Sequence, residues 1–195
     1  MSVLIPFDKC IARPNEGNIE YSLKAHLSNV KQFMKQWNKD EDPILEKLLG
    51  LSGICHDIAK SHKDWQSYIR NPQKRKGPTH APAGAFLFSF LAYKILEANN
   101  EWKNYRIHWL WLIRDIADHH SSLQKLDHTN WIKAWDWNKM DLNGIGGFIQ
   151  EQYPELSDLK LNEEILDDWI DRAFELVEEV MDELDLGYDP PPPLH

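Results

Sequence analysis

Apolar residues recur at intervals of three and four positions along most of this chain, and this spacing restricts it to a helical fold. Over residues 21–38 the repeat places one apolar stripe along a helix. The stripe consists of Leu23, Leu27, Val30, Met34 and Trp37. No segment of comparable length shows the alternating pattern of a strand, and no internal repeat is present. We therefore predict an all-α protein.

Four further helices follow from local signals. Asp42 is a suitable N-cap, and Pro43 a suitable first-turn residue, for a helix that ends near residue 60. Residues 83–96 are apolar nearly all round, so this helix is expected to be central. Residues 102–118 form another apolar helix. The last spans residues 162–184, with Asn162 as its cap, Gly187 as its stop and an acidic outer face. Residues 143–147 are interpreted as a glycine-rich break.

The length of 195 residues fits one domain, and we assign it to residues 1–188. Residues 189–195 contain four consecutive prolines and are interpreted as a tail or linker. Cys10 and Cys55 form no CxxC pair, which excludes a disulfide framework and a cysteine zinc site. The first residues lack the pattern of a secretion signal, and no apolar stretch looks long enough to cross a bilayer. We expect a cytoplasmic protein with no membrane partner.

Charge is distributed unevenly along the chain, whose formal net charge is −9. Residues 151–189 hold 15 acidic side chains against two basic ones, which leaves the rest of the chain at +4. Six basic residues lie within a segment of 17 positions that contains only one acidic residue. They are Lys60, Lys63, Arg70, Lys74, Arg75 and Lys76. This run is either a solvated loop or a rim that attracts phosphate.

Two aromatic groups lie near basic residues. Trp65 and Tyr68 fall inside the basic run, where they either stack on bases or simply pack. Trp131, Trp135 and Trp137 form a second group, for which a core or docking role is favoured over base stacking.

The chain contains nine histidines, and five of them, together with one aspartate, are the residues that most suggest chemistry. His56 and Asp57 end an apolar helix, and an aspartate there is costly to bury without a cation or a metal. Imidazole and carboxylate are ordinary ligands of divalent transition metals, and a carboxylate can bridge two ions. The other candidates are His26, His80, His119 and His120. His119 and His120 are adjacent, so one must leave regular helical geometry if both reach the same ion.

The order of these residues resembles the HD-superfamily nuclease domain of the CRISPR type I nuclease-helicase. The similarity rests on His26, His56-Asp57, His80 before Gly84, and the double histidine, and covers about residues 21–122. It implies an HD-domain-like helical bundle with a two-metal site at its centre. It also implies cleavage of single-stranded DNA, delivered by a CRISPR helicase domain or subunit and, through it, the RNA-guided effector complex.

The resemblance also implies a role for each matching residue. His26, His56 and Asp57 correspond to ligands of a first ion. Asp57, His80, His119 and His120 correspond to ligands of a second ion. Lys60 corresponds to a lysine near the scissile phosphate. The family's late acidic ligand falls on the last helix, where Asp182 is the candidate and Asp171 the next. The expected ions are Mn, Ni, Co or Fe rather than Mg, which prefers oxygen ligands.

Two other functions remain open from the sequence. One is an HD-type phosphohydrolase of a small nucleotide or cyclic oligonucleotide. The other is a non-catalytic docking module whose histidines are structural. No GxxxxGK[ST] phosphate loop occurs, so ATP-driven unwinding is expected to come from a partner.

Overall fold

Seven α-helices and four short 3₁₀ turns make up the regular structure of the described residues, which are 4–39, 41–71 and 77–186 of a computed structural model. Within these ranges no β-strand is formed, and only two isolated β-bridges occur. The prediction of an all-α fold is therefore confirmed. The helices are α1 (Leu23–Lys35), α2 (Pro43–Ile58), α3 (Lys63–Arg70), α4 (Ala81–Ala98), α5 (Trp102–Asp118), α6 (Leu142–Gln152) and α7 (Glu163–Leu186). The 3₁₀ turns are η1 (Phe7–Lys9), η2 (Ala59–Ser61), η3 (Trp137–Lys139) and η4 (Pro154–Leu156).

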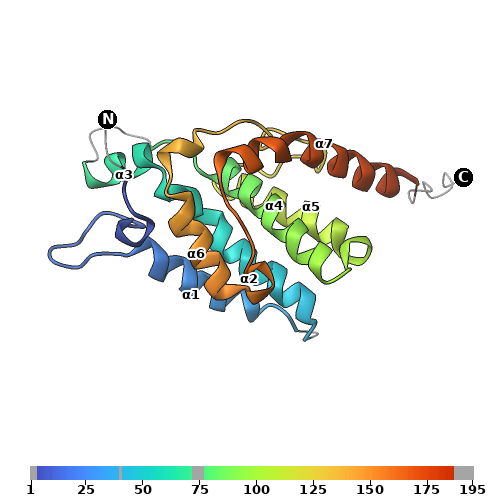
Figure 1. Ribbon diagram of the computed structural model, residues 1–195, viewed down its shortest axis with the longest axis horizontal. Helices are drawn as coiled ribbons and strands as arrows, with labels where there is room; N and C mark the ends of the chain where they lie inside the picture. The colour runs from blue at the N-terminus through green and yellow to red at the C-terminus, as the bar shows by residue number, and fades with distance from the viewer. Residues whose placement is uncertain (1–3, 40, 72–76, 187–195) are drawn as a thin grey trace, which may run out of the picture.

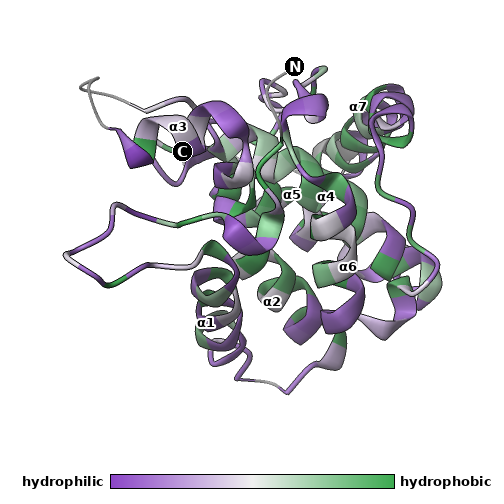
Figure 2. Cartoon of the chain, turned by 60° about the vertical axis from the view of Figure 1, so that its left-hand side comes forward, coloured by the Kyte–Doolittle hydropathy of each residue, from purple (hydrophilic) through white to green (hydrophobic). Residues whose placement is uncertain are grey.

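The helices pack in a fixed order from one side of the bundle to the other. α1 lies against α2, α2 contacts both α4 and α5, and these two helices lie side by side (Figure 1). α7 crosses the far side of α4 and α5 (Figure 1). Apolar residues of α2, α4 and α5 meet in the interior, whereas the outer faces of α1 and α7 are largely hydrophilic (Figure 2).

α4 is the core helix, as its composition predicted. Its buried residues include Phe86, Phe88 and Leu91, each fully shielded from solvent. The helix is 18 residues long, and by length and apolarity alone it is sufficient to cross a membrane. This differs from the sequence expectation, which judged that stretch too short. Since 72% of α4 is buried inside the molecule, its placement is that of a core helix.

Side-chain caps fix where the helices begin. Asp42 accepts hydrogen bonds from the amides of Ile44 and Leu45 at 2.8 and 2.9 Å, as predicted for the start of α2. Asn162 accepts one from the amide of Ile165 at 2.9 Å, which confirms the predicted cap of α7. These bonds satisfy amides that have no partner inside the helix.

Three sequence expectations are wrong. Residues 143–147 are not a break but lie inside α6, because Asp141 caps the amide of Gly144 and the apolar side chains beyond it are buried. The basic run is not a loop throughout, since α3 occupies its middle. Trp37, expected in the apolar stripe of the first helix, lies beyond the end of α1 and is 62% exposed.

Other expectations fall outside the described residues. Gly187 and the proline-rich tail lie beyond the end of α7 as described. Lys74, Arg75 and Lys76 lie in the gap at residues 72–76.

Two glycines let three helices approach one another closely. A Cβ atom on Gly84 of α4 would lie 2.2 Å from the carbonyl oxygen of Cys55 in α2. A Cβ atom on Gly53 of α2 would lie 3.0 Å from the backbone of Val30 and Lys31 in α1. Only glycine permits these contacts without displacing a helix. They bring the start of α4 and the middle of α1 against the end of α2.

We predict that Gly84→Ala destabilises the protein by about 1–3 kcal/mol, because its methyl group overlaps a backbone oxygen that cannot move alone. Urea unfolding measures the change. Gly147→Ala is the matched control, since nothing lies within 4 Å of a Cβ atom there. That variant should be neutral or more stable by up to about 1 kcal/mol. Equal stability of the two variants would contradict the close-approach argument.

Candidate metal centre

The ends of three helices and the face of a fourth converge on a single point. Asp57 and His56 lie in the last turn of α2, and His80 immediately precedes α4. His119 follows the last residue of α5, and His26 faces the group from α1. The six side chains predicted from the sequence, including His120, are thus brought together. Their role as metal ligands stays a prediction.

The Asp57 carboxylate is the centre of the group. Its Oδ2 lies 3.0 Å from Nε2 of His26 and 3.3 Å from Nε2 of His56. Its Oδ1 lies 3.0 Å from Nε2 of His80 and 3.7 Å from Nε2 of His119. The two oxygens therefore face different pairs of imidazoles. This is the arrangement that a bridging carboxylate requires.

Backbone carbonyls orient two of the imidazole rings. Nδ1 of His56 donates to the carbonyl of Gly53 at 2.8 Å, and Nδ1 of His119 donates to that of Ile116 at 2.7 Å. A ring that donates through Nδ1 keeps Nε2 free as an acceptor or metal ligand. In both cases that Nε2 faces Asp57. These contacts provide the outer support that metal-binding histidines commonly have.

His120 lies in the turn after α5, so the double histidine leaves helical geometry as predicted. Its Nε2 is 3.2 Å from Nε2 of His80. Two nitrogens bound to one ion at about 2.1 Å lie about 3.0–3.4 Å apart, so this separation fits neighbouring ligands.

Two sets of side chains could each hold an ion. One contains His26, His56 and Asp57; the other contains Asp57, His80, His119 and His120. Within each set all the ligand atoms lie within 4.8 Å of one another. His119 and His120 are exposed, so the second set is open to solvent on one side. Nitrogen-rich donors with an open position fit a divalent transition metal at a reactive site.

Burial and hydrogen bonding act in opposite directions on Asp57, whose side chain is only 6% exposed. Burial alone would raise the pKa of this carboxyl group. The facing imidazoles of His119, His26, His56 and His80 outweigh burial and hold the pKa of Asp57 well below its usual range. Burial, with the nearby His119 and His80, lowers the pKa of His120. Both directions favour the protonation states that bind metal, a carboxylate and a neutral imidazole.

Lys60 is the cation of the centre. Its Nζ donates to Asp57 Oδ2 at 2.7 Å and lies 5.0 Å from the centroid of the Trp65 ring. Buried Gln66 donates to the Lys60 carbonyl at 2.8 Å and to the carbonyl of Ile11 at 2.8 Å. Lys60 is therefore fixed at its backbone by Gln66 and at its side chain by Asp57 and Trp65.

The two aromatic groups are mostly structural. Trp65 is 8% exposed and packs edge-to-face against His80, with ring centroids 5.7 Å apart. Trp131 and Trp137 are fully buried in the core, which agrees with the favoured interpretation. Trp135 is half-buried beneath Lys133, whose Nζ lies 4.2 Å from the ring centroid.

The candidate late acidic ligand on α7, Asp182, lies outside both sets. Glu183, next to Asp182, is bound by Arg106 near the start of α5. The histidine pair follows the other end of that helix, about 20 Å away at a rise of about 1.5 Å per residue. Neither candidate set contains an acid of α7 among the described residues. Asp182 and Asp171 are exposed on α7 and belong to neither set, so a late acidic ligand from this helix stays a prediction.

The proposed DNA-binding residues are only partly described. Arg70 is bound by its own surroundings, since its guanidinium donates to Gln66 and to the carbonyl of Lys9 at 3.0 and 2.6 Å. It holds the N-terminal segment against α3. Lys63 is the first residue of α3 and is half-buried.

Sequence analysis missed a buried ion pair beside the centre. Arg114 and Asp118 are 1% and 5% exposed, and their side chains meet at 2.6 Å. The signal was a pair of opposite charges at i,i+4 within an apolar helix. Arg114 also donates to the carbonyl of His128 at 2.6 Å, and Asp118 accepts from the amide of Gln124 at 2.8 Å. The pair thus holds the loop that follows the double histidine.

Two cavities open beside the centre, one for each candidate set. The larger, about 690 Å³, is lined by His80 and His120. The other, about 510 Å³, is lined by His26 and Arg13. Lys60 lines both cavities, so it lies at their junction.

Comparisons with models of protein families, with curated proteins and with solved structures found no match to this chain. Fold and side-chain geometry therefore carry the functional argument.

We predict that the protein, purified without an affinity tag, retains a transition metal, and that Asp57→Ala reduces metal affinity by more than about tenfold because both sets lose their shared ligand. Elemental analysis after dialysis measures the metal-to-protein ratio. Asp182→Ala is the matched control and should bind as the wild type does. Loss of metal in Asp182→Ala alone would contradict the assignment.

Proposed function

We propose that this chain is a metal-dependent nuclease with an HD-like bundle that hydrolyses phosphodiester bonds of single-stranded DNA. The observation that carries the proposal is the buried Asp57 carboxylate, each oxygen of which faces its own pair of imidazoles. A carboxylate so placed suits a pair of divalent ions. When bound, such ions supply an activated water and offset charge on the attacking and leaving oxygens.

The positions of the two cavities support a diester substrate. A monoester needs space on one side of its phosphate, whereas a diester inside a strand needs space on both. The cavities beside His120 and beside His26 provide two such spaces, and Lys60 stands between them. A strand that entered one cavity and left through the other would pass its phosphate over the centre.

The chain's own residues supply the remaining requirements. Lys60 adds a fixed positive charge where the two cavities meet, suited to stabilise a phosphate in the transition state or to protonate a leaving oxygen. His56 and His119 are held by carbonyls, so they need little reorganisation during reaction. Arg13 adds a second cation to the cavity beside His26.

A single-strand nuclease needs a supply of unpaired DNA. We propose that a CRISPR helicase domain or subunit delivers it, within type I interference and through the RNA-guided effector complex. The support is the order of His26, His56-Asp57, His80 and the double histidine, together with the convergence of these residues.

A second candidate function is hydrolysis of a small nucleotide or cyclic oligonucleotide. The size of the larger cavity favours it, since about 690 Å³ is within the range of small-molecule sites. Offering free nucleotides, cyclic oligonucleotides and circular single-stranded DNA to the same preparation separates the two functions.

We predict that the protein cleaves circular single-stranded DNA with Mn²⁺, and that Asp57→Ala abolishes cleavage while helical content stays unchanged. Lys60→Ala should lower kcat by about 10²-fold or more, because a charge at the reacting phosphate is lost. Gel assays and circular dichroism measure these effects. Lys103→Ala, an exposed change at the start of α5, is the matched control and should retain full activity. Activity retained in Asp57→Ala would refute the proposal.

We also predict a role in DNA binding for the basic residues at positions 74–76. Replacing Lys74, Arg75 and Lys76 together with alanine should weaken binding to single-stranded DNA and reduce the salt slope by about 2, at about 0.7 per phosphate contact. Fluorescence anisotropy across a salt series measures this slope. An unchanged slope would assign the three residues to a solvated surface.

A further inference from the structure

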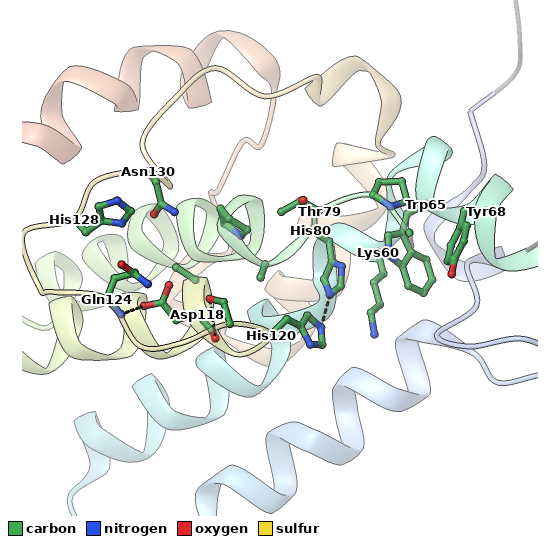
Figure 3. Close-up of a pocket in the computed structure, with 16 residues that line it drawn as sticks. Lys60, Trp65, Tyr68, Thr79, His80, Asp118, His120, Gln124, His128 and Asn130 are labelled. Carbon is green, nitrogen blue, oxygen red and sulfur yellow. Dashed lines mark hydrogen bonds between the residues drawn. The ribbon is translucent and has the colours of Figure 1, made fainter. Parts of the chain in front are cut away.

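The cavity beside His80 and His120 has two chemically different ends. Figure 3 shows Trp65 and Tyr68 at one end, Gln124, His128 and Asn130 at the other, and the two histidines between them. A site that only conducts a phosphate backbone has no need for amide side chains at a fixed distance from its metal ligands. The amide end is therefore suited to bind a part of the ligand other than its phosphate.

The two amides leave at least one acceptor, on Gln124, and one donor, on Asn130, for a ligand. Nε2 of Gln124 donates to the carbonyl of Ser122 at 2.9 Å, which leaves its Oε1 as a free acceptor. Oδ1 of Asn130 accepts from Arg114 at 3.4 Å, which leaves its Nδ2 as a free donor. Neither free atom has a hydrogen-bond partner among the described residues. A matched donor and acceptor is what the edge of a nucleobase offers and requires.

The amide end is built rather than incidental. The buried Arg114–Asp118 pair binds three points of the loop, namely the carbonyl of His128, Oδ1 of Asn130 and the amide of Gln124. Asp118 directly precedes the double histidine, so one ion pair positions both the loop and the end of α5. The backbone of Gln124 and the side chain of Asn130 are therefore held at a set place relative to His120.

The aromatic end offers a ring at the other limit of the cavity. Trp65 is covered by Lys60 and by its edge contacts with His80 and Tyr68. Tyr68 is half-buried and lines the cavity beside Gly77. It can flank a neighbouring base, while the amides address the edge of the base at the other end.

We propose that this cavity is a nucleoside subsite, in which Gln124 and Asn130 recognise the base of one nucleotide next to the scissile phosphate. The inference rests on the proposed nuclease function and gives it a base preference at one position. Because the four bases arrange donors and acceptors differently along their edges, they fit one fixed donor and acceptor unequally.

The test has a cleavage arm and a binding arm. In the first, circular single-stranded DNA of mixed sequence is cut with Mn²⁺ and the new ends are sequenced. In the second, anisotropy measures binding of short labelled oligo-dA, oligo-dC, oligo-dG and oligo-dT without added metal. The proteins are the wild type, the Gln124→Ala/Asn130→Ala double variant, Asn130→Asp, and Gln36→Ala as an exposed control in the turn after α1.

We expect the wild type and Gln36→Ala to favour one base by about tenfold at one position beside the cut. The double variant should reduce that bias to within about threefold. Asn130→Asp keeps the oxygen that accepts from Arg114 but replaces the Nδ2 donor by a second acceptor. The base preference should therefore shift to another base and not disappear.

The outcomes test the subsite proposal separately from the nuclease proposal. Cleavage without base bias, or a bias unaltered in the double variant, would overturn the subsite and leave the nuclease intact. If no metal supports cleavage, the nuclease proposal fails, and the binding arm alone decides. Base-dependent binding that the double variant loses would then support the subsite, and equal binding of the four oligonucleotides would overturn it.

Discussion

One buried carboxylate determines how the rest of this structure is arranged. Asp57 lies inside the bundle with four imidazoles and one ammonium group around it. A buried charge that loses its partners destabilises a protein by about 3–5 kcal/mol, so the surrounding groups are required and not optional. They arrive from α1, from the last turn of α2 and the turn after it, from the start of α4 and from the end of α5. The helix packing is thus coupled to the chemistry of one side chain.

The scaffold brings these groups together through backbone proximity. Gly53 and Gly84 remove side-chain bulk at the points where α1 and α4 touch α2. Gln66 ties the Lys60 turn to the N-terminal segment, and the Arg114–Asp118 pair ties the loop after α5. Each contact lies a few residues from a member of the centre. A frame of this kind suits the proposed function, which requires metals and a phosphate to be held in fixed geometry.

The sequence predicted the helices that have clear local signals better than those that depend on tertiary contacts. Periodicity and caps located α2, α4, α5 and α7, because apolar spacing and capping are local properties. The sequence-based prediction failed at α6. Its glycines suggested a break, but tertiary burial of Ile145 and Phe148 stabilises a helix there. The six side chains that converge could be named from their order in the chain. Asp182 could not be placed, because nothing local fixes which end of α5 the last helix approaches.

Features that depend on long-range contacts were invisible from the sequence. The division of the Asp57 oxygens between two imidazole pairs needs the relative positions of four helices. The loop that carries Gln124 and Asn130 has no regular structure, and it is positioned by a buried pair whose partners lie on α5. The sequence showed the charges of that pair but not what they hold.

Anomalous X-ray diffraction from crystals grown with Mn²⁺ tests the central claim most directly. The account predicts two peaks on opposite sides of the Asp57 carboxylate, one within bonding distance of His26 and His56 and the other of His80, His119 and His120. A map with no peak at Asp57, or with metal bound only elsewhere, would contradict it.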